Sequence, residues 1–252
     1  MNKITFTCFS EQGSRRANED CCRYVSNPDD GRYLFVACDG MGGHAMGEVA
    51  SQVVATTICE YWEQAFFADG VEPVLQTAFR LASEALDAKA DVLHKVEMGT
   101  TMVLAAIYND KITIAHCGDS RCYLLRPNVG IVYRTEDHIE QSVWGDYINR
   151  SFFSYHRLNA NVEIRQFDLQ PGDRVFLCTD GVSSYVNPDI LKDRLMDDKS
   201  PEEVADIVKY LCEKSNTPDN YSGILVFNEK VYQDETDNRR PSNSSYQRVS
   251  ES

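Results

Sequence analysis

The chain has 252 residues, 42% of them hydrophobic, which is typical of one large folded domain or two small ones. Its 25 basic and 39 acidic residues give a formal net charge of −14, which argues against nucleic acid as a partner. The acidic excess indicates either a solvated surface or carboxylates clustered around cations. No apolar stretch is long enough for a membrane span and no signal-peptide pattern precedes residue 3, so we expect a cytoplasmic monomer that does not bind membranes.

The first part of the chain predicts three strands followed by two helices. Residues 3–10, 21–25 and 32–39 carry the short apolar runs typical of strands. Residues 46–63 and 72–92 then change period, because apolar side chains recur every three or four positions, as on one face of a helix. The turn residues of FFADGVEP separate the two helices.

The remainder of the chain returns to strands. They are predicted at residues 100–107, 112–117, 121–126, 131–135, 162–169, 173–180 and 223–228. The first four, separated by YNDK, GDS and PNVG, are expected to pair as antiparallel hairpins, and the turn QPG joins the next two. A helix is expected from Ser200, because Ser-Pro-Glu-Glu combines an N-cap, a first-turn proline and a capping-box glutamate.

The order of these elements predicts an α+β fold with largely antiparallel sheets covered by helices. Nine cysteines are scattered without metal-binding spacing and are expected to be reduced core residues. From Glu229 the sequence becomes polar, so residues 1–228 are predicted to form the domain and residues 229–252 a disordered tail.

Five aspartates lie where apolar strands begin or end: Asp20, Asp39, Asp119, Asp180 and Asp219. Each one alone is explained by turn or cap chemistry. The strand ends of a packed sheet converge, however, and crowded carboxylates repel one another unless a cation is present. Mg²⁺ and Mn²⁺ prefer such oxygen ligands, and no cysteine or histidine pair has zinc-site spacing. The sequence therefore predicts a divalent-cation site.

The stretch DGMGGH, residues 39–44, extends this predicted site. Gly40 has no Cβ, so the backbone can approach closely and its carbonyl can serve as a metal ligand. The two following glycines let the chain turn sharply and place His44 beside the cations.

At these residues the chain resembles the metal-dependent serine/threonine protein phosphatases of type 2C, in their bacterial single-domain form. The matching stretches run in the family's order between about residues 10 and 228: RRANED, DGMGGHAMGEVAS, GTTMVLAAI, IAHCGDSRCYLLR, TEDH, QPGDRVFLCTDGV and PDNYSGILV. The resemblance implies two antiparallel sheets packed face to face and flanked by helix pairs. It also implies two divalent cations, Mg²⁺ or Mn²⁺, held between the sheets.

Carried over residue by residue, the resemblance gives each acidic side chain a role. Asp39 would bridge both cations, and the Gly40 carbonyl would bind one of them. The other implied ligands, partly through water, are Asp20, Asp180 and Asp219. Glu19 would support these ligands from outside, and Asp119 would hold a third, weaker cation.

The resemblance also implies a phosphate-binding arginine, and the spacing to the first aspartate favours Arg15 over its neighbour Arg16. His44 is the candidate general acid for the leaving serine or threonine oxygen. The implied reaction is direct attack on phosphorus by a water or hydroxide that bridges the two metals. Three further histidines are expected to be structural: His94, His116 and His138. No cysteine has the neighbours of a thiolate nucleophile.

The segment 138–170 departs from the family, which usually carries a mobile flap with an apolar helix there. Its aromatic residues Trp144, Tyr147, Phe152 and Phe153 either form an apolar lip that docks a partner or cover a sheet edge. The expected function is dephosphorylation of proteins that a serine/threonine kinase has phosphorylated. Two alternatives remain open: a catalytically weak regulatory module on the same fold, and a phosphatase for a small phosphorylated metabolite.

Overall fold

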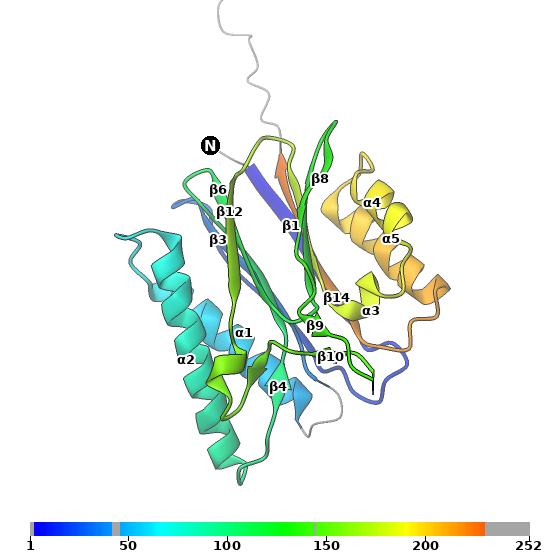
Figure 1. Cartoon of the computed structure of the whole chain (residues 1–252). Coiled ribbons are helices and arrows are strands. Elements are labelled where there is room, and N and C mark those ends of the chain that lie inside the picture. The colour runs from blue at the N-terminus through cyan, green and yellow to red at the C-terminus, as the bar shows by residue number, and fades with distance from the viewer. Residues whose placement is uncertain (1–2, 42–45, 144, 230–252) are drawn as a thin grey trace, which may run out of the picture.

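The structure is a computed structural model of the chain, and it describes residues 3–41, 46–143 and 145–229. Within these residues two five-stranded sheets pack face to face, with helices on both outer sides (Figure 1). The expected α+β sandwich of antiparallel sheets flanked by helix pairs is therefore confirmed. The site predicted from the strand ends depends on how these two sheets are arranged.

Both sheets are antiparallel throughout. The strands of the first sheet are, in spatial order, β1 (Lys3–Glu11), β14 (Tyr221–Glu229), β13 (Arg174–Cys178), β7 (Arg121–Arg126) and β8 (Gly130–Arg134). Those of the second are β12 (Glu163–Asp168), β6 (Lys111–Cys117), β5 (Met102–Tyr108), β3 (Arg32–Asp39) and β2 (Asp20–Asn27). Some sequence neighbours, such as β6 and β7 or β12 and β13, are thus divided between the two sheets.

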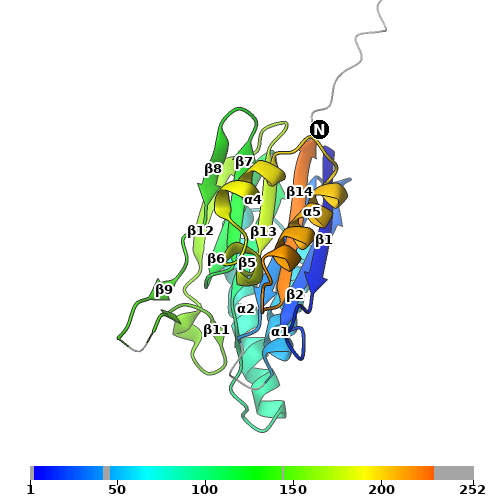
Figure 2. The same ribbon diagram turned by 90° about the vertical axis from the view of Figure 1, so that its right-hand side faces the viewer.

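Two pairs of helices cover the sandwich (Figures 1 and 2). Helices α1 (Gly47–Gln64) and α2 (Val71–Val92) cover the second sheet, and α4 (Pro188–Leu195) and α5 (Pro201–Lys214) cover the first. The short elements are α3 (Asp180–Ser183), the 3-10 helix η1 (Arg157–Asn159), and the strand pairs β4 (Gly99–Thr100) with β11 (Phe152–Phe153) and β9 (Ile139–Glu140) with β10 (Tyr147–Ile148).

Alternation along the strands explains why three apolar layers form. In β3, Phe35 belongs to the core between the sheets, while its neighbour Val36 packs under α1 and α2. In β13, Val175 faces the core between the sheets and Phe176 faces α4 and α5. A strand that is apolar on both faces can only lie between two layers, so these strands specify the sandwich.

The hairpins predicted for residues 100–107 with 112–117 and for 121–126 with 131–135 are confirmed as β5–β6 and β7–β8. The expectation that GDS also makes a hairpin is wrong, because β6 and β7 lie in different sheets. Turn length alone does not distinguish a hairpin from a crossing between stacked sheets. Gly118 makes the crossing with a φ of +117°, and a Cβ there would lie 2.6 Å from the Thr101 Cβ.

Helix starts follow the capping rules. The predicted capping box is confirmed, since Glu203 N donates to Ser200 Oγ and Ser200 N donates to the Glu203 carboxylate. Helix α4 was missed, although Asn187 caps it by accepting from the backbone N–H groups of residues 189 and 190 and a proline follows at the first helical position.

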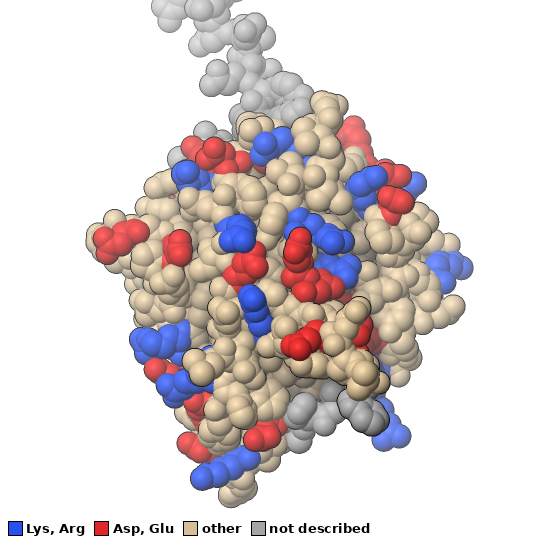
Figure 3. Space-filling view, in the orientation of Figure 1, with Lys and Arg blue, Asp and Glu red and all other residues tan. Residues whose placement is uncertain are grey.

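The surface and the chain end agree with the composition. Figure 3 shows acidic and basic side chains interspersed on one face, as on a solvated surface. Among the described residues, no helix has the length and apolarity needed to cross a membrane. All nine cysteines are free and six of them are buried. Strand β14 runs to Glu229, one position beyond the predicted domain end, and the rest of the predicted tail lies outside the described residues.

Candidate active site

The site begins with a pair of aspartates on adjacent strands. Asp20 opens β2 and Asp39 ends β3, and the two residues are direct cross-strand partners. Side chains at such positions lie on the same face of the sheet and close together. Both carboxylates are therefore placed at one end of the second sheet by strand register alone.

The first sheet delivers two more aspartates to the same end. Asp180 follows β13 after one residue, Thr179, and Asp219 precedes β14; these two strands pair antiparallel, so the end of one lies beside the start of the other. In Figure 1 this end of the sandwich carries the labels α3, β9 and β10. The GDS crossing between β6 and β7 brings Asp119 to the same place. Five chain segments from both sheets thus meet at one end.

These residues surround a pocket of about 490 Å³. Six acidic residues line it: Glu19, Asp39, Asp119, Asp146, Asp180 and Asp219. Arg15 is the one basic side chain among the described lining residues, and Arg16 is not among them. Asp20 is not among these lining residues. It contacts the first sheet through Thr179, whose hydroxyl donates to Asp20 Oδ2 at 2.9 Å. The structure therefore brings together every predicted ligand that it describes.

Burial raises the pKa values of several of these carboxyl groups. The pKa of Asp20 is raised to about 7 mainly by burial; hydrogen bonds from Ser222 and Thr179 oppose the shift, and the charges of Asp180 and Asp219 add to it. Burial and the Asp180 charge raise the pKa of Asp119 to about 7 as well.

The same effect is strongest at Asp39. Burial, followed by the charges of Asp20 and Asp180, raises the pKa of Asp39 well above its usual value. Asp39 also shares a hydrogen bond with Asp180, which requires that one of the two carboxyl groups carries the proton. A bound cation would take the place of this shared proton, because a proton and a cation both relieve the repulsion between the two carboxyl groups.

Three carboxylate oxygens indicate whether a metal ion fits in this pocket. The Oδ1 atoms of Asp20, Asp119 and Asp180 are buried without any hydrogen-bond partner. Leaving a buried acceptor unpaired costs about 1–3 kcal/mol, more when it is charged. An all-oxygen donor set of this kind matches the preference of Mg²⁺ and Mn²⁺. The residues present therefore fit a hard divalent cation.

The backbone at Gly40 is also confined. Its N–H donates to the Glu19 carbonyl at 3.1 Å, and a Cβ at this position would collide with the backbone of Gly47 at the start of α1. Only glycine lets the chain pass this close to the helix. The sequence argument for a close approach at Gly40 agrees with this arrangement, with α1 as the neighbour.

Threonines that sequence reasoning passed over hold the aspartates in place. The Thr100 hydroxyl donates to the Asp39 carbonyl at 2.7 Å, and the Thr101 hydroxyl accepts from Asp39 N at 3.2 Å. Ser222 N donates to the Thr179 hydroxyl at 3.0 Å, which links Asp20 on one sheet to β14 on the other. Thr179 directly precedes Asp180 in CTDG, but Thr100 and Thr101 of GTTMV have no predicted strand-end acid beside them, so the sequence does not reveal these contacts.

Segment 138–170 contributes to the pocket through the β9–β10 hairpin. Asp146, Tyr147 and Ile148 line it, and Asp146 had not been predicted. Phe152 is fully buried and packs on Phe79 of α2 with ring centroids 6.3 Å apart, so it covers the sheet and forms no lip. Trp144 and the proposed general acid His44 lie outside the described residues, and their roles stay predictions.

A second group of potential metal ligands does not suit a metal. The ligand atoms of His116, His138 and Glu163 lie within 4.8 Å of one another. The two imidazole rings stack at 4.3 Å and 13°, so their lone pairs lie in nearly parallel planes and do not converge on one ion. His138 Nδ1 accepts from Gly118 N at 3.2 Å, and its Nε2 lies 3.3 Å from Arg150 Nη1. This geometry agrees with the structural role expected for both histidines, namely support of the turn that carries Asp119.

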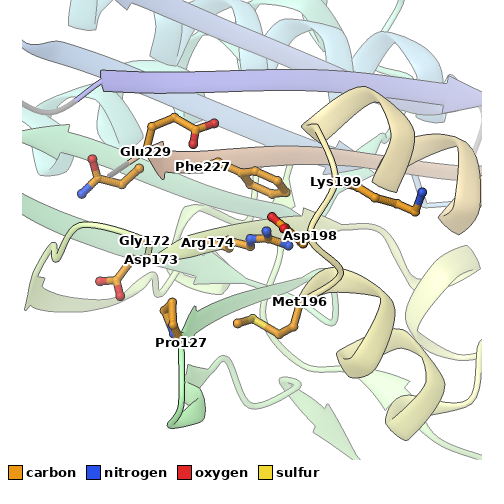
Figure 4. Close-up of a pocket in the computed structure, with 10 residues that line it drawn as sticks. Pro127, Gly172, Asp173, Arg174, Met196, Asp198, Lys199, Phe227 and Glu229 are labelled. Atoms are coloured by element: carbon orange, nitrogen blue, oxygen red, sulfur yellow. The ribbon is translucent and has the colours of Figure 1, made fainter. Parts of the chain in front are cut away.

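A second cavity, of about 390 Å³, lies at the other end of β13 and β14 (Figure 4). The Arg174 guanidinium sits over the Phe227 ring at 4.2 Å, and its Nη1 donates to the carbonyl oxygens of Leu195 and Asp197 at 2.7 and 2.6 Å. In Figure 4 the Asp198 carboxylate lies beside the same guanidinium. Arg174 therefore fastens the end of α4 to the sheet, and its charge is compensated locally.

Two antiparallel sheets meet around a pocket that is lined by acidic residues and one arginine. This arrangement is that of a metal-dependent phosphatase. Residues 10–223 match the Protein phosphatase 2C family, and the chain belongs to that family. The predicted enzyme class, a metal-dependent serine/threonine protein phosphatase, is confirmed.

Relatives and solved structures agree with this membership. The serine/threonine phosphatase stp of Listeria welshimeri is 29% identical over 230 residues, covering 84% of this chain and 90% of that protein. A bacterial serine phosphatase crystal structure is 25% identical with a TM-score of 0.80, covering 92% of this chain and all of the other. The catalytic domain of PstP in complex with two manganese ions is 25% identical with a TM-score of 0.77, covering 91% of this chain and 100% of that domain. The last of these agrees with the expected pair of divalent cations.

Proposed function

We propose that this chain removes phosphate from phosphoserine and phosphothreonine in proteins, using two divalent cations held by its strand-end aspartates. The proposed ligands are Asp20, Asp39, Asp180 and Asp219, with the Gly40 carbonyl. The observation that carries the proposal is the convergence of unpaired, buried carboxylate oxygens from both sheets on a pocket that also holds Arg15. Asp119, which lines the same pocket, is the proposed ligand of a third, weaker cation, and Glu19 supports the set from outside.

When bound, the cations would lower the pKa of a coordinated water and neutralise charge on the phosphate. The chain's own residues supply the remaining steps. Asp39 gives up the proton that it shares with Asp180, since both carboxylates must be ionised to bind metal. Arg15 presents a planar fork that matches two phosphate oxygens and orients the phosphorus toward the acids. His44 is the proposed proton donor to the leaving oxygen.

The proposal extends to the setting of the reaction. Residues 1–228 act as the phosphatase domain, and residues 229–252 as a polar tail. The enzyme works as a monomer in the cytoplasm on products of a serine/threonine kinase. Phosphorylated proteins suit the pocket because several loops, including the β9–β10 hairpin, surround it and can contact residues on either side of the phosphate.

A panel of substrates tests this function against its alternatives. The purified chain is assayed with Mn²⁺ on a phosphothreonine peptide, a phosphosugar and p-nitrophenyl phosphate, and again after chelation. Turnover of the peptide that disappears with chelation supports the proposal. Preference for the phosphosugar would indicate a metabolite phosphatase, and no turnover of any substrate would indicate a regulatory module. Rates that survive chelation would overturn the metal mechanism.

A further inference from the structure

We infer that Asn220 is a positioning residue that holds the loop carrying Arg15, residues 12–19, against the acidic pocket. The inference rests on the proposed function, because it takes Arg15 as the phosphate-binding group. Asn220 lies between Asp219 and β14 and is only 5% exposed. In the sequence it is simply the residue after Asp219 in PDNYSGILV.

The side-chain amide of Asn220 is fully used by this loop. Its Oδ1 accepts from Glu19 N at 3.0 Å, and its Nδ2 donates to the carbonyl oxygens of Gln12 and Ala17 at 2.7 and 2.9 Å. These bonds reach both ends of the loop, across more than 200 positions of sequence. The loop has no strand pairing of its own, so the hydrogen bonds of this one buried amide hold its backbone in place.

The other contacts between the two segments are weaker or replaceable. The Ser14 hydroxyl donates to the Pro218 carbonyl at 2.9 Å in an exposed position. Arg15 Nη2 lies 2.6 Å from Asp219 Oδ2, with side chains 49% and 22% exposed. Exposed ion pairs contribute little to stability. This pair must also open when Asp219 binds a cation and Arg15 binds phosphate. The side-chain bonds of Asn220 involve no group that changes partner, so they keep the loop in place during that exchange.

Glu19 links the loop onward to the second sheet. Its backbone N–H is held by Asn220, while its carbonyl accepts from Gly40 N at 3.1 Å and from the Ser51 hydroxyl at 2.7 Å. A shift at Asn220 would therefore move Arg15 relative to the aspartates. A misplacement of about 1 Å in an active site can reduce the rate by about a hundredfold.

The chain offers a matched control at the far end of the same strand. Asn228 is 2% exposed, and its Nδ2 donates to the Gln170 carbonyl at 2.9 Å, far from the acids. Asn220→Ala and Asn228→Ala each remove a buried amide that binds backbone carbonyls. Both variants are expected to lower Tm, but only the first should change how the enzyme binds phosphate.

The experiment measures kcat and KM for p-nitrophenyl phosphate at saturating Mn²⁺, the inhibition constant of inorganic phosphate, and Tm. For Asn220→Ala we expect kcat/KM to fall and inhibition by phosphate to weaken, each by about tenfold. Asn228→Ala should keep the inhibition constant within about twofold. Asn220→Asp, nearly isosteric, keeps the acceptor but turns a carboxylate oxygen toward two carbonyls, and it serves if the alanine variant does not fold.

A double-mutant cycle with Arg15→Ala separates positioning from general destabilisation. If Asn220 acts through Arg15, then Asn220→Ala adds little to the weakened phosphate inhibition once Arg15 is gone. Additive effects, or equal effects of the Asn220 and Asn228 variants on phosphate inhibition, would overturn the inference. A wild-type enzyme with no Mn²⁺-dependent turnover would instead overturn the proposed function, and this inference with it.

Discussion

Arg15 and Asp219 are 204 positions apart in the chain, yet the guanidinium Nη2 lies 2.6 Å from the carboxylate Oδ2. The arginine expected to bind phosphate therefore neutralises one of the expected metal ligands. Burial plays little part in this pair, and the pKa of Arg15 is raised mainly by its hydrogen bond to Asp219. Cation binding by Asp219 and phosphate binding by Arg15 both require this pair to separate, which couples the two binding events.

This pairing predicts opposite effects on the two ligands. In Arg15→Ala, Asp219 loses a competing positive charge, so Mn²⁺ should bind about two- to fivefold more tightly, as expected for a partly exposed pair. Inorganic phosphate should bind about 10- to 100-fold more weakly, because a charge-assisted contact is lost. Titration calorimetry on metal-free protein measures the first, and inhibition kinetics the second. Arg16→Ala is the control, and equal effects of the two substitutions would contradict the assignment.

Asp39 is expected to be indispensable for turnover. Asp39→Asn keeps the size of the side chain but removes the charge that would bridge two cations. Activity on p-nitrophenyl phosphate with Mn²⁺ should fall by at least about a thousandfold. Circular dichroism and Tm should remain those of a folded protein, since the neutral amide relieves repulsion among the buried acids. Retention of a tenth of the activity would show that Asp39 is not a bridging ligand.

The metal-free protein should become less stable as pH rises. Asp20 and Asp119 have folded-state pKa values of about 7, above their unfolded value of 3.8, so the folded state binds more protons. The stability they contribute is complete at low pH and is lost as pH rises toward 7. His138, with a pKa lowered to about 4 by burial, and His116, whose pKa burial also lowers, oppose this below pH 6.5, while the raised pKa values of Asp39 and Asp180 add to it.

The test is a series of melting curves between pH 5.5 and 7.5 with a chelator present. Tm should fall by several degrees over this range, because 1 kcal/mol corresponds to about 2–4 °C in a protein of this size. Asp119→Asn should reduce the slope, and saturating Mn²⁺ should reverse it by binding the ionised carboxylates. A metal-free Tm that rises with pH would exclude the carboxyl repulsion described above.

Gly181 is expected to be intolerant of a side chain. A Cβ there would collide with the carbonyl oxygen of Asn220, so Gly181→Ala must displace the backbone that carries Asp219. Mn²⁺ affinity should fall by about tenfold or more, a shift that calorimetry can measure. Gly31→Ala is a suitable comparison, since Gly31 has a φ of +62° but nothing within 4 Å of the added Cβ. A larger loss of metal affinity in the Gly31 variant would refute the steric argument.

The long strands and helices could be predicted from apolar periodicity, while the short elements could not. Residues 121–126 match β7 at both ends because its central residues are buried and only its terminal arginines are partly exposed. The two-residue strands β9, β10 and β11 are too short to show any period. Helix α4 buries only Leu191 and Leu195, so its mostly polar sequence resembled a loop despite the Asn187 cap.

The aspartates of the site could be predicted because their residue type and their place at strand ends both indicate metal binding. Thr179, Asn220 and Asp146 could not, because their roles depend on which loops meet after folding. The GDS error has the same origin, since local spacing does not reveal to which sheet a strand belongs. Where function depends on proximity between distant segments, composition and period carry no signal.

The capping box of α5 provides a stability test away from the site. Ser200→Ala removes the hydroxyl that accepts from Glu203 N, which should lower the free energy of unfolding by about 1 kcal/mol. Tm should fall by about 2–4 °C with kcat and KM unchanged. Ser215→Ala, at the other end of the helix, should have a smaller effect. Altered kinetics in the Ser200 variant would mean that α5 communicates with the pocket.

The Thr179 hydroxyl joins Asp20 of one sheet to a strand end of the other, and the proposed ligands are drawn from both layers in the same way. A bound ion would hold the two sheets of the sandwich together. Its removal should let the two layers slide against each other while every strand stays paired with its neighbours. Amide exchange in the interlayer core would then quicken on chelation well before the protein melts.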